Sequence, residues 1–128
     1  MRTMPLRARL HNRTTGEMLS ETAFLMTSLR DRFFGMLSPG LPPSAVVGLT
    51  PCDWIHTFGL RRPLDIAYCD ADGQVLDIAF GMPPHQLGRR VRGTHTVWEA
   101  PDGSFAGHVS LGDVLQREIV SQTAESVA

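Results

Sequence analysis

The sequence predicts a single, mainly β (α+β) domain with one short helix in its N-terminal half. Three observations support this prediction. The length of 128 residues is enough for one hydrophobic core. Several short segments alternate apolar and polar residues with the period of two that strands show, whereas one segment repeats with helical spacing. We expect the strands to curl into a small barrel or sandwich over residues 1–120, followed by a polar tail over residues 121–128.

The N-terminal segment predicts two strands that meet at a turn. Residues 5–11 alternate apolar side chains with arginine and histidine, which is typical of a half-buried strand. Residues 12–16 end in glycine and favour a turn. Met18 and Leu19 then return as a short second strand.

A helix is predicted next, from Ser20 to Phe34, and we expect it to cover one opening of the barrel. Ser20 is a candidate N-cap, and Gly35 with Pro39-Gly40 would end the helix. Four apolar residues recur at helical spacing and predict a buried stripe: Leu25, Leu29, Phe33 and Met36. On this interpretation, replacing Phe33 with alanine would cost roughly 3–5 kcal/mol of stability.

The middle of the chain predicts a buried strand and a β-hairpin. Residues 45–49 are apolar throughout, as in a strand covered on both faces. Residues 64–69 and 74–80 alternate with period two, and Asp70-Ala71-Asp72-Gly73 between them has the composition of a hairpin turn.

The remainder predicts one long loop and three further strands. Residues 81–94 hold two prolines, three glycines and three arginines, which favours an exposed loop. We expect a strand over residues 95–99, a turn at 101–103, a broken strand over 105–111 and a last strand over 114–120.

Composition excludes some classes of function. All 12 cationic residues are arginines, so Schiff-base chemistry on lysine and a phosphate-binding loop that needs lysine are excluded. A net charge of −1 gives no overall attraction to nucleic acid or to an anionic membrane, and we expect neither as a partner.

The chain is expected to stay in the cytoplasm. Prolines and arginines interrupt the first ten residues, and no run of about 18 apolar residues predicts a membrane span. Cys52 and Cys69 are then expected to be reduced thiols, because the cytoplasm disfavours structural disulfides. Whether the two lie close in space is left open.

Cys52 and His56 could in principle bind zinc, with Asp65, Cys69 or His95 as further ligands, because thiolate, imidazole and carboxylate groups all coordinate this metal. Structural zinc ligands normally come in closely spaced pairs, and this chain has none. We therefore predict no metal and no cofactor.

A catalytic group is a second possibility at the same residues. His56 with Asp65 or Asp53 could form a general-base pair, and Cys52 or Thr57 could be the nucleophile that the pair activates. Asp65 follows a proline at the start of a strand, where a carboxylate often accepts hydrogen bonds from nearby backbone amides instead.

Five of the 12 arginines lie in two short segments, Arg61-Arg62 and the loop with Arg89, Arg90 and Arg92. Together they could form an anion-binding rim, because guanidinium groups bind anions well. The predicted function is a non-enzymatic binding or accessory module for an anionic small ligand or an acidic protein surface. The alternative is a small hydrolase-like enzyme that uses His56 with Asp65 or Cys52. Whether any reaction is catalysed, the oligomeric state and the identity of the ligand are left open. The predicted ligand-binding residues are His56, Thr57, Arg61, Asp65, Arg89, Arg90 and Arg92.

An ordered set of motifs lies between Ala23 and Leu115, over most of the chain. Its positions are Arg32, Gly35-Met36-Leu37, Cys52, His56-Thr57-Phe58-Gly59-Leu60-Arg61, Pro63-Leu64-Asp65, Asp70-Ala71-Asp72-Gly73, Trp98-Glu99-Ala100-Pro101 and Leu111-Gly112-Asp113. This set resembles a family of uncharacterised bacterial and archaeal proteins, domain-of-unknown-function family 192. The resemblance implies a compact, mostly β fold without an established activity. Many members carry Trp-Met-Lys-Asn-Thr at residues 56–60, so no role of that lysine or asparagine transfers to this chain.

Overall fold

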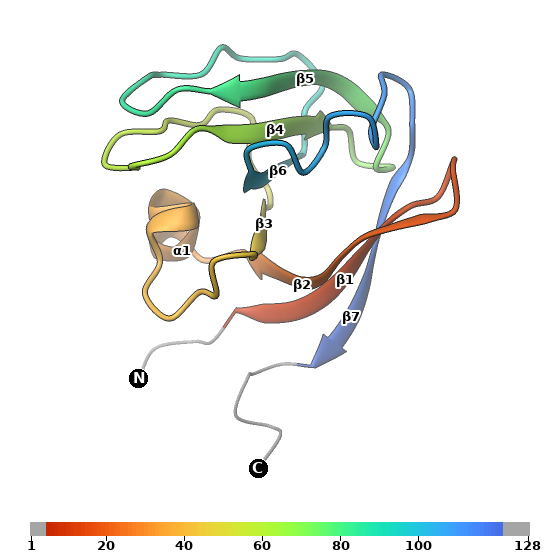
Figure 1. Cartoon of the computed structure of the whole chain (residues 1–128), viewed down its shortest axis with the longest axis horizontal. Helices are drawn as coiled ribbons and strands as arrows, with labels where there is room; N and C mark the ends of the chain where they lie inside the picture. Colours follow the sequence, from red (N-terminus) through yellow and green to blue (C-terminus); the bar gives the residue numbers. More distant parts are fainter. Residues whose placement is uncertain (1–4, 122–128) are drawn as a thin grey trace.

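A computed structural model describes residues 5–121 and consists mainly of one seven-stranded sheet (Figure 1). The strand order is β5-β4-β6-β3-β2-β1-β7, and all neighbours are antiparallel except β2 and β3. The elements are β1 (Leu6–Asn12), β2 (Glu17–Met26), α1 (Leu29–Phe34), the 3-10 turn η1 (Gly35–Leu37), β3 (Val46–Leu49), β4 (Leu64–Cys69), β5 (Val75–Met82), β6 (Thr96–Pro101) and β7 (Leu115–Ser121).

The sheet curls strongly without closing into a barrel. Its two edge strands are β5 and β7, and they meet at one point, where Gln74 and Val114 form an isolated antiparallel bridge. There the Leu115 N–H donates to the Gly73 carbonyl at 2.8 Å. Figure 1 shows β4 and β5 above β1 and β2, with β3 and β6 between them. The predicted mainly β, curled architecture is therefore confirmed, although its barrel is open.

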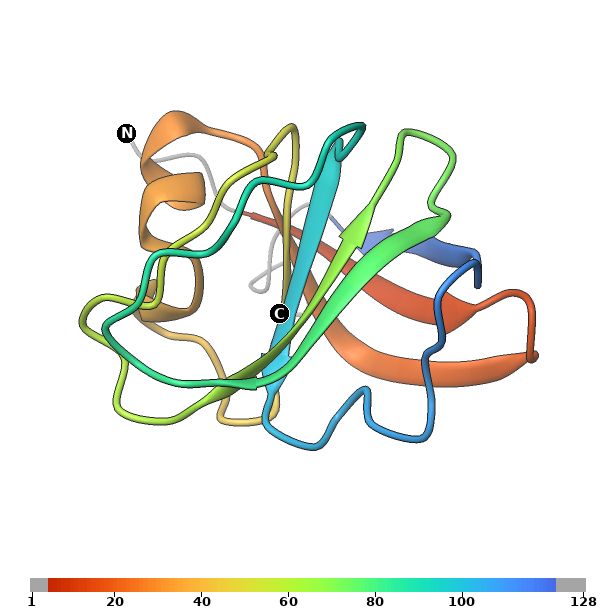
Figure 2. The ribbon, with the colours of Figure 1, turned by 90° about the horizontal axis from the view of Figure 1, so that it is seen from above.

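Two apolar cores lie on the two faces of the sheet. The helix-side core packs under α1 and the segment that follows β3, and the opposite core packs under the segment that precedes β7 (Figures 1 and 2). The helix-side core consists of Met26, Val47, Leu49, Ile55, Leu64, Ile66, Tyr68, Met82 and Val97. The largest side chains of the opposite core are Leu10, Leu25, Trp98, Phe105 and Leu115.

The predicted hairpin is β4 and β5, and its alternation is observed. Ile66 and Tyr68 enter the helix-side core, whereas Ala67 and Cys69 enter the opposite core. Both cysteines are free thiols, and Cys52 packs at the edge of the helix-side core. The predicted strands over 5–11, 45–49, 95–99 and 114–120 correspond to β1, β3, β6 and β7.

The predicted helix begins eight residues too early. Ser20 lies inside β2, which pairs with β1 on one side and β3 on the other, so tertiary pairing overrides the helical periodicity. The N-cap is Ser28, whose Oγ accepts the Asp31 N–H at 3.1 Å. The predicted buried stripe is also wrong, because Phe33 is 65% exposed.

The broken strand predicted over 105–111 is a series of turns. The Val109 N–H donates to the Phe105 carbonyl at 2.9 Å, and both side chains are buried in the opposite core. A backbone hydrogen bond between residues four apart closes a turn, which an extended strand cannot form. Of the predicted tail, residues 122–128 lie outside the described residues. No helix within residues 5–121 is long and apolar enough to cross a membrane.

Candidate functional site

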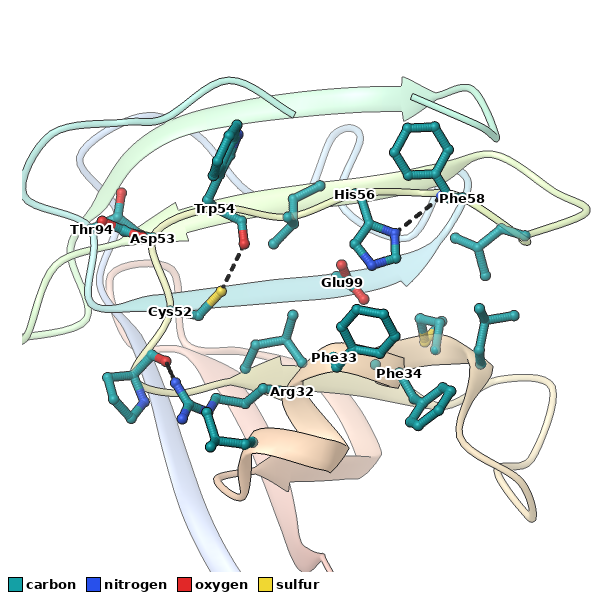
Figure 3. A pocket seen from close by; sticks show the side chains of 18 of the residues that line it. Arg32, Phe33, Phe34, Cys52, Asp53, Trp54, His56, Phe58, Thr94 and Glu99 are labelled. Atoms are coloured by element: carbon teal, nitrogen blue, oxygen red, sulfur yellow. Dashed lines mark hydrogen bonds between the residues drawn. The ribbon is translucent and has the colours of Figure 1, made fainter. Parts of the chain in front are cut away.

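A cavity of about 510 Å³ lies between α1 and the segment that follows β3 (Figure 3). Side chains from α1 form one wall, and residues 51–60 form the other. The floor comes from the sheet itself, at Leu49 of β3 and Glu99 of β6. The cavity thus draws on segments that are far apart in the sequence.

The wall made by residues 51–60 is held by a second loop, residues 83–88. His56 and Leu87 form an antiparallel bridge between the two loops. Thr57 is completely buried, and its hydroxyl donates to the Pro83 carbonyl at 2.7 Å and accepts the Gln86 N–H at 3.0 Å. Thr57 therefore fastens the wall and exposes no surface to a ligand.

Aromatic rings line the mouth of the cavity. The Phe33 ring contacts the Phe34 ring edge to face at a centroid distance of 5.3 Å and lies 5.6 Å from the His56 ring. His56 in turn stacks on Phe58 at 5.5 Å. The three phenylalanine rings are apolar but exposed, and a group of exposed apolar rings often marks a binding site.

The His56 ring is oriented by a backbone N–H group two residues along the chain. Its Nδ1 accepts the Phe58 N–H at 3.2 Å, so the neutral ring carries its proton on Nε2. Figure 3 shows the His56 ring and the Glu99 carboxylate both directed into the cavity. His56 is the predicted ligand-binding residue that the structure places in the cavity lining.

Glu99 is the buried ionisable group of the cavity. It lies on β6 between β3 and β4, and only 3% of its surface is exposed. Burial raises its pKa from the ordinary 4.5 to about 7, although a hydrogen bond from the Met36 backbone opposes the rise. Within residues 5–121 Glu99 forms no ion pair. Its charge is therefore not balanced by a neighbouring cation.

Gly35 lets α1 approach this carboxylate. A Cβ at this position would lie 3.0 Å from Glu99 Oε1, closer than side chains normally pack. Gly35 also adopts a φ of 47°, which side-chain-bearing residues rarely tolerate. A glycine is therefore required for the helix end to cover Glu99.

Arg32 and Cys52 complete the polar part of the cavity. An Arg32 terminal nitrogen donates to the Pro51 carbonyl at 2.6 Å, and the Arg32 Nε is buried without a partner. The Cys52 thiol donates to the Trp54 carbonyl at 3.2 Å. Burial raises the pKa of Cys52 above 9.0, so the reactive thiolate is disfavoured.

Asp65 lies outside this site. Its two carboxylate oxygens accept the backbone N–H groups of Gly81 and Phe105, each at 2.9 Å, and 1% of its surface is exposed. Phe105 belongs to the opposite core, so Asp65 points away from the face that carries His56. The predicted pairing of His56 with Asp65 is wrong, because Leu64 and Ile66 enter the helix-side core and Asp65 between them therefore points to the opposite face. The alternative interpretation, that Asp65 bonds backbone amides, is confirmed.

The arginines of the predicted anion-binding rim do not share one surface. Residues 54–59 pair in antiparallel fashion with residues 85–88, as Figure 2 shows for the two adjacent loops. This register places residues 89–92 at the Trp54 end of the pair and residues 61–62 beyond the other end. A single rim of five arginines is therefore not formed.

Two of the loop arginines already have partners. Arg89 forms an ion pair with Asp77 of β5. The Arg90 guanidinium stacks over the Trp54 ring at 4.4 Å, while the Trp54 Nε1–H donates to the Gly88 carbonyl. Arg61, Arg62 and Arg92 are exposed. Among residues 5–121, no three His, Cys, Asp or Glu side chains are grouped so that they could hold a metal.

The residue that sequence reasoning missed is Glu99. It is the charged residue of the segment Thr96-Val97-Trp98-Glu99-Ala100, all of which is buried. A carboxylate in an otherwise apolar strand is a signal of a functional or buried polar site. Phe33 was missed because the longer predicted helix assigned it to a buried stripe, and Arg32 was named only as a position that matches family 192.

Comparison with known proteins places the fold but not the function. No known family model and no curated protein matches the chain, so the resemblance to family 192 stays a prediction. Two solved structures are similar in fold. A putative transcription regulator from Sinorhizobium meliloti 1021 has a TM-score of 0.72 and 21% identity, over 91% of this chain and 96% of that one. A protein of unknown function from Novosphingobium aromaticivorans DSM 12444 has a TM-score of 0.69 and 19% identity, over 88% of this chain and 84% of that one.

Proposed function

We propose that this protein is a non-enzymatic module that binds a small molecule in the cavity beneath α1. The observation that carries the proposal is a cavity of about 510 Å³ with exposed rings at its mouth and a buried carboxylate at its floor. Small-molecule sites in proteins are mostly apolar, contain a few polar groups and measure roughly 300–1,000 Å³. The cavity meets each of these criteria.

Binding is favoured over catalysis by the state of the candidate reactive groups. Cys52 is a poor nucleophile because burial raises its pKa, and Asp65 is held by two backbone amides away from His56. The side chains that line the cavity are mainly apolar. They suit recognition of a ligand more than attack on one.

The ligand that we propose is not an anion. The buried ionisable group of the cavity is Glu99, and once it is ionised a second negative charge beside it would be repelled. The arginines that suggested an anion lie at two separate places outside the cavity floor. The predicted anionic ligand is therefore replaced by a neutral or cationic one.

A fragment screen followed by backbone amide NMR tests this proposal. We expect aromatic fragments to shift the resonances of residues 33–37 and 52–58 in the wild-type protein. Phe33→Ala should weaken this binding, whereas Phe80→Ala removes another exposed ring on β5, outside the cavity, and should not. A screen in which no fragment shifts these resonances, or in which both variants behave alike, would contradict the proposal.

One observation favours a second candidate function, proton-transfer catalysis. A carboxyl group with a pKa near 7 beside a histidine is suited to exchange protons with a substrate at neutral pH. The two functions are separated by incubating an identified ligand with the protein and following it by mass spectrometry. Conversion that Glu99→Gln abolishes would favour the enzyme, and an unchanged ligand favours the binding module.

We further propose that the chain is a divergent member of domain-of-unknown-function family 192. Support comes from the order of the matching motifs and from the mostly β fold that the resemblance implies. Of its Trp98-Glu99-Ala100-Pro101 motif, Glu99 lies at the cavity floor. A structure of an established member tests the proposal, since its matching glutamate should lie buried beneath the helix.

A further inference from the structure

The floor of the cavity holds a buried carboxyl group that forms no ion pair with a cation of the described residues. Glu99 is 3% exposed, and the one hydrogen bond that opposes its pKa rise comes from the Met36 backbone. An ionised carboxylate has about four lone-pair directions for hydrogen bonds. Capacity therefore remains for donors from a ligand.

Arg32, the arginine that lines the cavity in the described part of the chain, forms no ion pair with Glu99. Figure 3 shows the Arg32 side chain directed to the side of the cavity, where its guanidinium donates to the Pro51 carbonyl. The space in front of Glu99 is thus open to a cation from outside.

The rings at the mouth favour the same kind of ligand. Phe33, His56 and Phe58 contact one another in series beside Glu99, and Phe33 and Phe58 are at least half exposed. Aromatic faces carry partial negative charge and attract cations within about 6 Å of their centroids. Aromatic rings around a buried carboxylate therefore complement a cation that carries an apolar group.

We propose that the ligand is a small organic cation, a protonated amine whose N–H groups bond to Glu99 while its apolar part contacts Phe33, His56 and Phe58. This inference rests on the proposed function and specifies its ligand. An anion would be repelled by the ionised Glu99, and a purely apolar ligand would leave the carboxylate without a partner. An amine satisfies both the charge and the rings.

The inference implies a defined pH dependence. Glu99 must be ionised to attract a cation, and its pKa is about 7, so affinity should fall roughly tenfold for each pH unit below 7. Other titratable or charged groups from α1, the segment that follows β3, β4 and the residue before β6 also face Glu99 or the cavity. These groups are Arg32, Cys52, Asp53, His56, Tyr68 and His95.

The test compares benzylamine with benzyl alcohol, which have the same ring and differ in charge. At pH 8 we expect wild-type protein to bind benzylamine at least tenfold more tightly, measured by NMR titration. Glu99→Gln should abolish this preference and retain the affinity for benzyl alcohol. Glu118→Gln removes an exposed glutamate of β7 and should leave the preference unchanged. A titration of wild-type protein from pH 8 to pH 5.5 provides a second measurement that needs no variant.

Each outcome decides one of the two proposals. Equal affinity for the two probes would overturn the cationic ligand and leave the binding module standing. If neither probe shifts the cavity resonances, and the wider fragment screen also finds no ligand, the binding module itself is overturned. A blocked Gly-Lys-Gly peptide that binds more tightly than butylamine would overturn the small molecule in favour of a lysine side chain of a partner.

Discussion

Two buried acidic residues on neighbouring strands have opposite surroundings. Asp65 of β4 pairs with Ala100 of β6, and the next pair along the ladder joins Ile66 to Glu99. Asp65 points to the opposite core, where two backbone N–H groups bond its two oxygens. Glu99 points to the helix side, where it faces a cavity and has a raised pKa.

The comparison shows that burial alone does not identify a functional acid. Both side chains are at most 3% exposed, but only one retains hydrogen-bonding capacity toward open space. Asp65 connects β5 and the segment at Phe105 to β4, and its negative charge is stabilised by fixed amides. Glu99 is held in the fold at a cost in stability, as groups at functional sites often are.

The largest predicted effect concerns Asp65. Asp65→Ala would leave the Gly81 and Phe105 N–H groups buried without an acceptor, which should reduce the free energy of unfolding by roughly 3–5 kcal/mol. Urea denaturation measures this loss, with Asp72→Ala in the exposed hairpin turn as the control. A loss below about 1 kcal/mol would mean that the amides find other partners.

Glu99 should affect stability in a pH-dependent way. Its pKa is about 7 in the folded chain and near 4.5 when unfolded, so the folded state binds the extra proton between these values. Stability should therefore fall by roughly 3 kcal/mol as pH rises from 4.5 through 7, and then level off.

Glu99→Gln should remove this dependence on pH. The variant should therefore become more stable relative to the wild type as the pH is raised. Thermal or urea melts at pH 5, 6, 7 and 8 measure the difference. Glu118→Gln, at an exposed ion pair with Arg9, serves as the control and should follow the wild type. Parallel curves for wild type and Glu99→Gln would show that Glu99 titrates as it does in water.

A smaller effect is expected at Thr57, which fastens the cavity wall. Thr57→Val keeps the shape but removes the hydroxyl that bonds the Pro83 carbonyl and the Gln86 N–H, and should cost about 1–3 kcal/mol. Thr57→Ser retains the hydroxyl and should cost less. If the two variants are equally unstable, the hydrogen bonds are not the source of the effect.

The smallest effect on stability is predicted for Phe33. Because its ring is 65% exposed, Phe33→Ala should change the free energy of unfolding by less than about 1 kcal/mol, instead of the roughly 3–5 expected for a buried stripe. The same variant should weaken ligand binding. A large loss of stability would show that the ring is buried in solution.

Most strands were predictable because their evidence is local. The hairpin of β4 and β5 has alternating side chains around a turn rich in aspartate and glycine, and these features suffice without tertiary contacts. The helix boundary was not predictable in this way. Residues 20–26 fit a helical stripe, but β1 and β3 on either side provide backbone partners that a sequence pattern does not reveal.

The site was less predictable because it depends on which face each residue occupies. His56, a predicted ligand-binding residue, lines the cavity, but Asp65 and Glu99 are both acids in apolar strands, and only strand pairing distinguishes their environments. The rings of Phe33 and Phe58 become a cavity mouth only when α1 and the 51–60 segment meet. Such long-range meetings carry no signature in the local sequence.

The pKa of the Glu99 side chain tests the central claim most directly. NMR titration of the ¹³C-labelled carboxyl group, assigned by its loss in Glu99→Gln, follows its protonation in the folded protein. We predict a midpoint near 7 in the free protein, and a lower midpoint with saturating benzylamine, because a bound cation stabilises the carboxylate. A midpoint near 4.5 that benzylamine leaves unchanged would contradict a buried, unneutralised carboxylate that anchors a ligand.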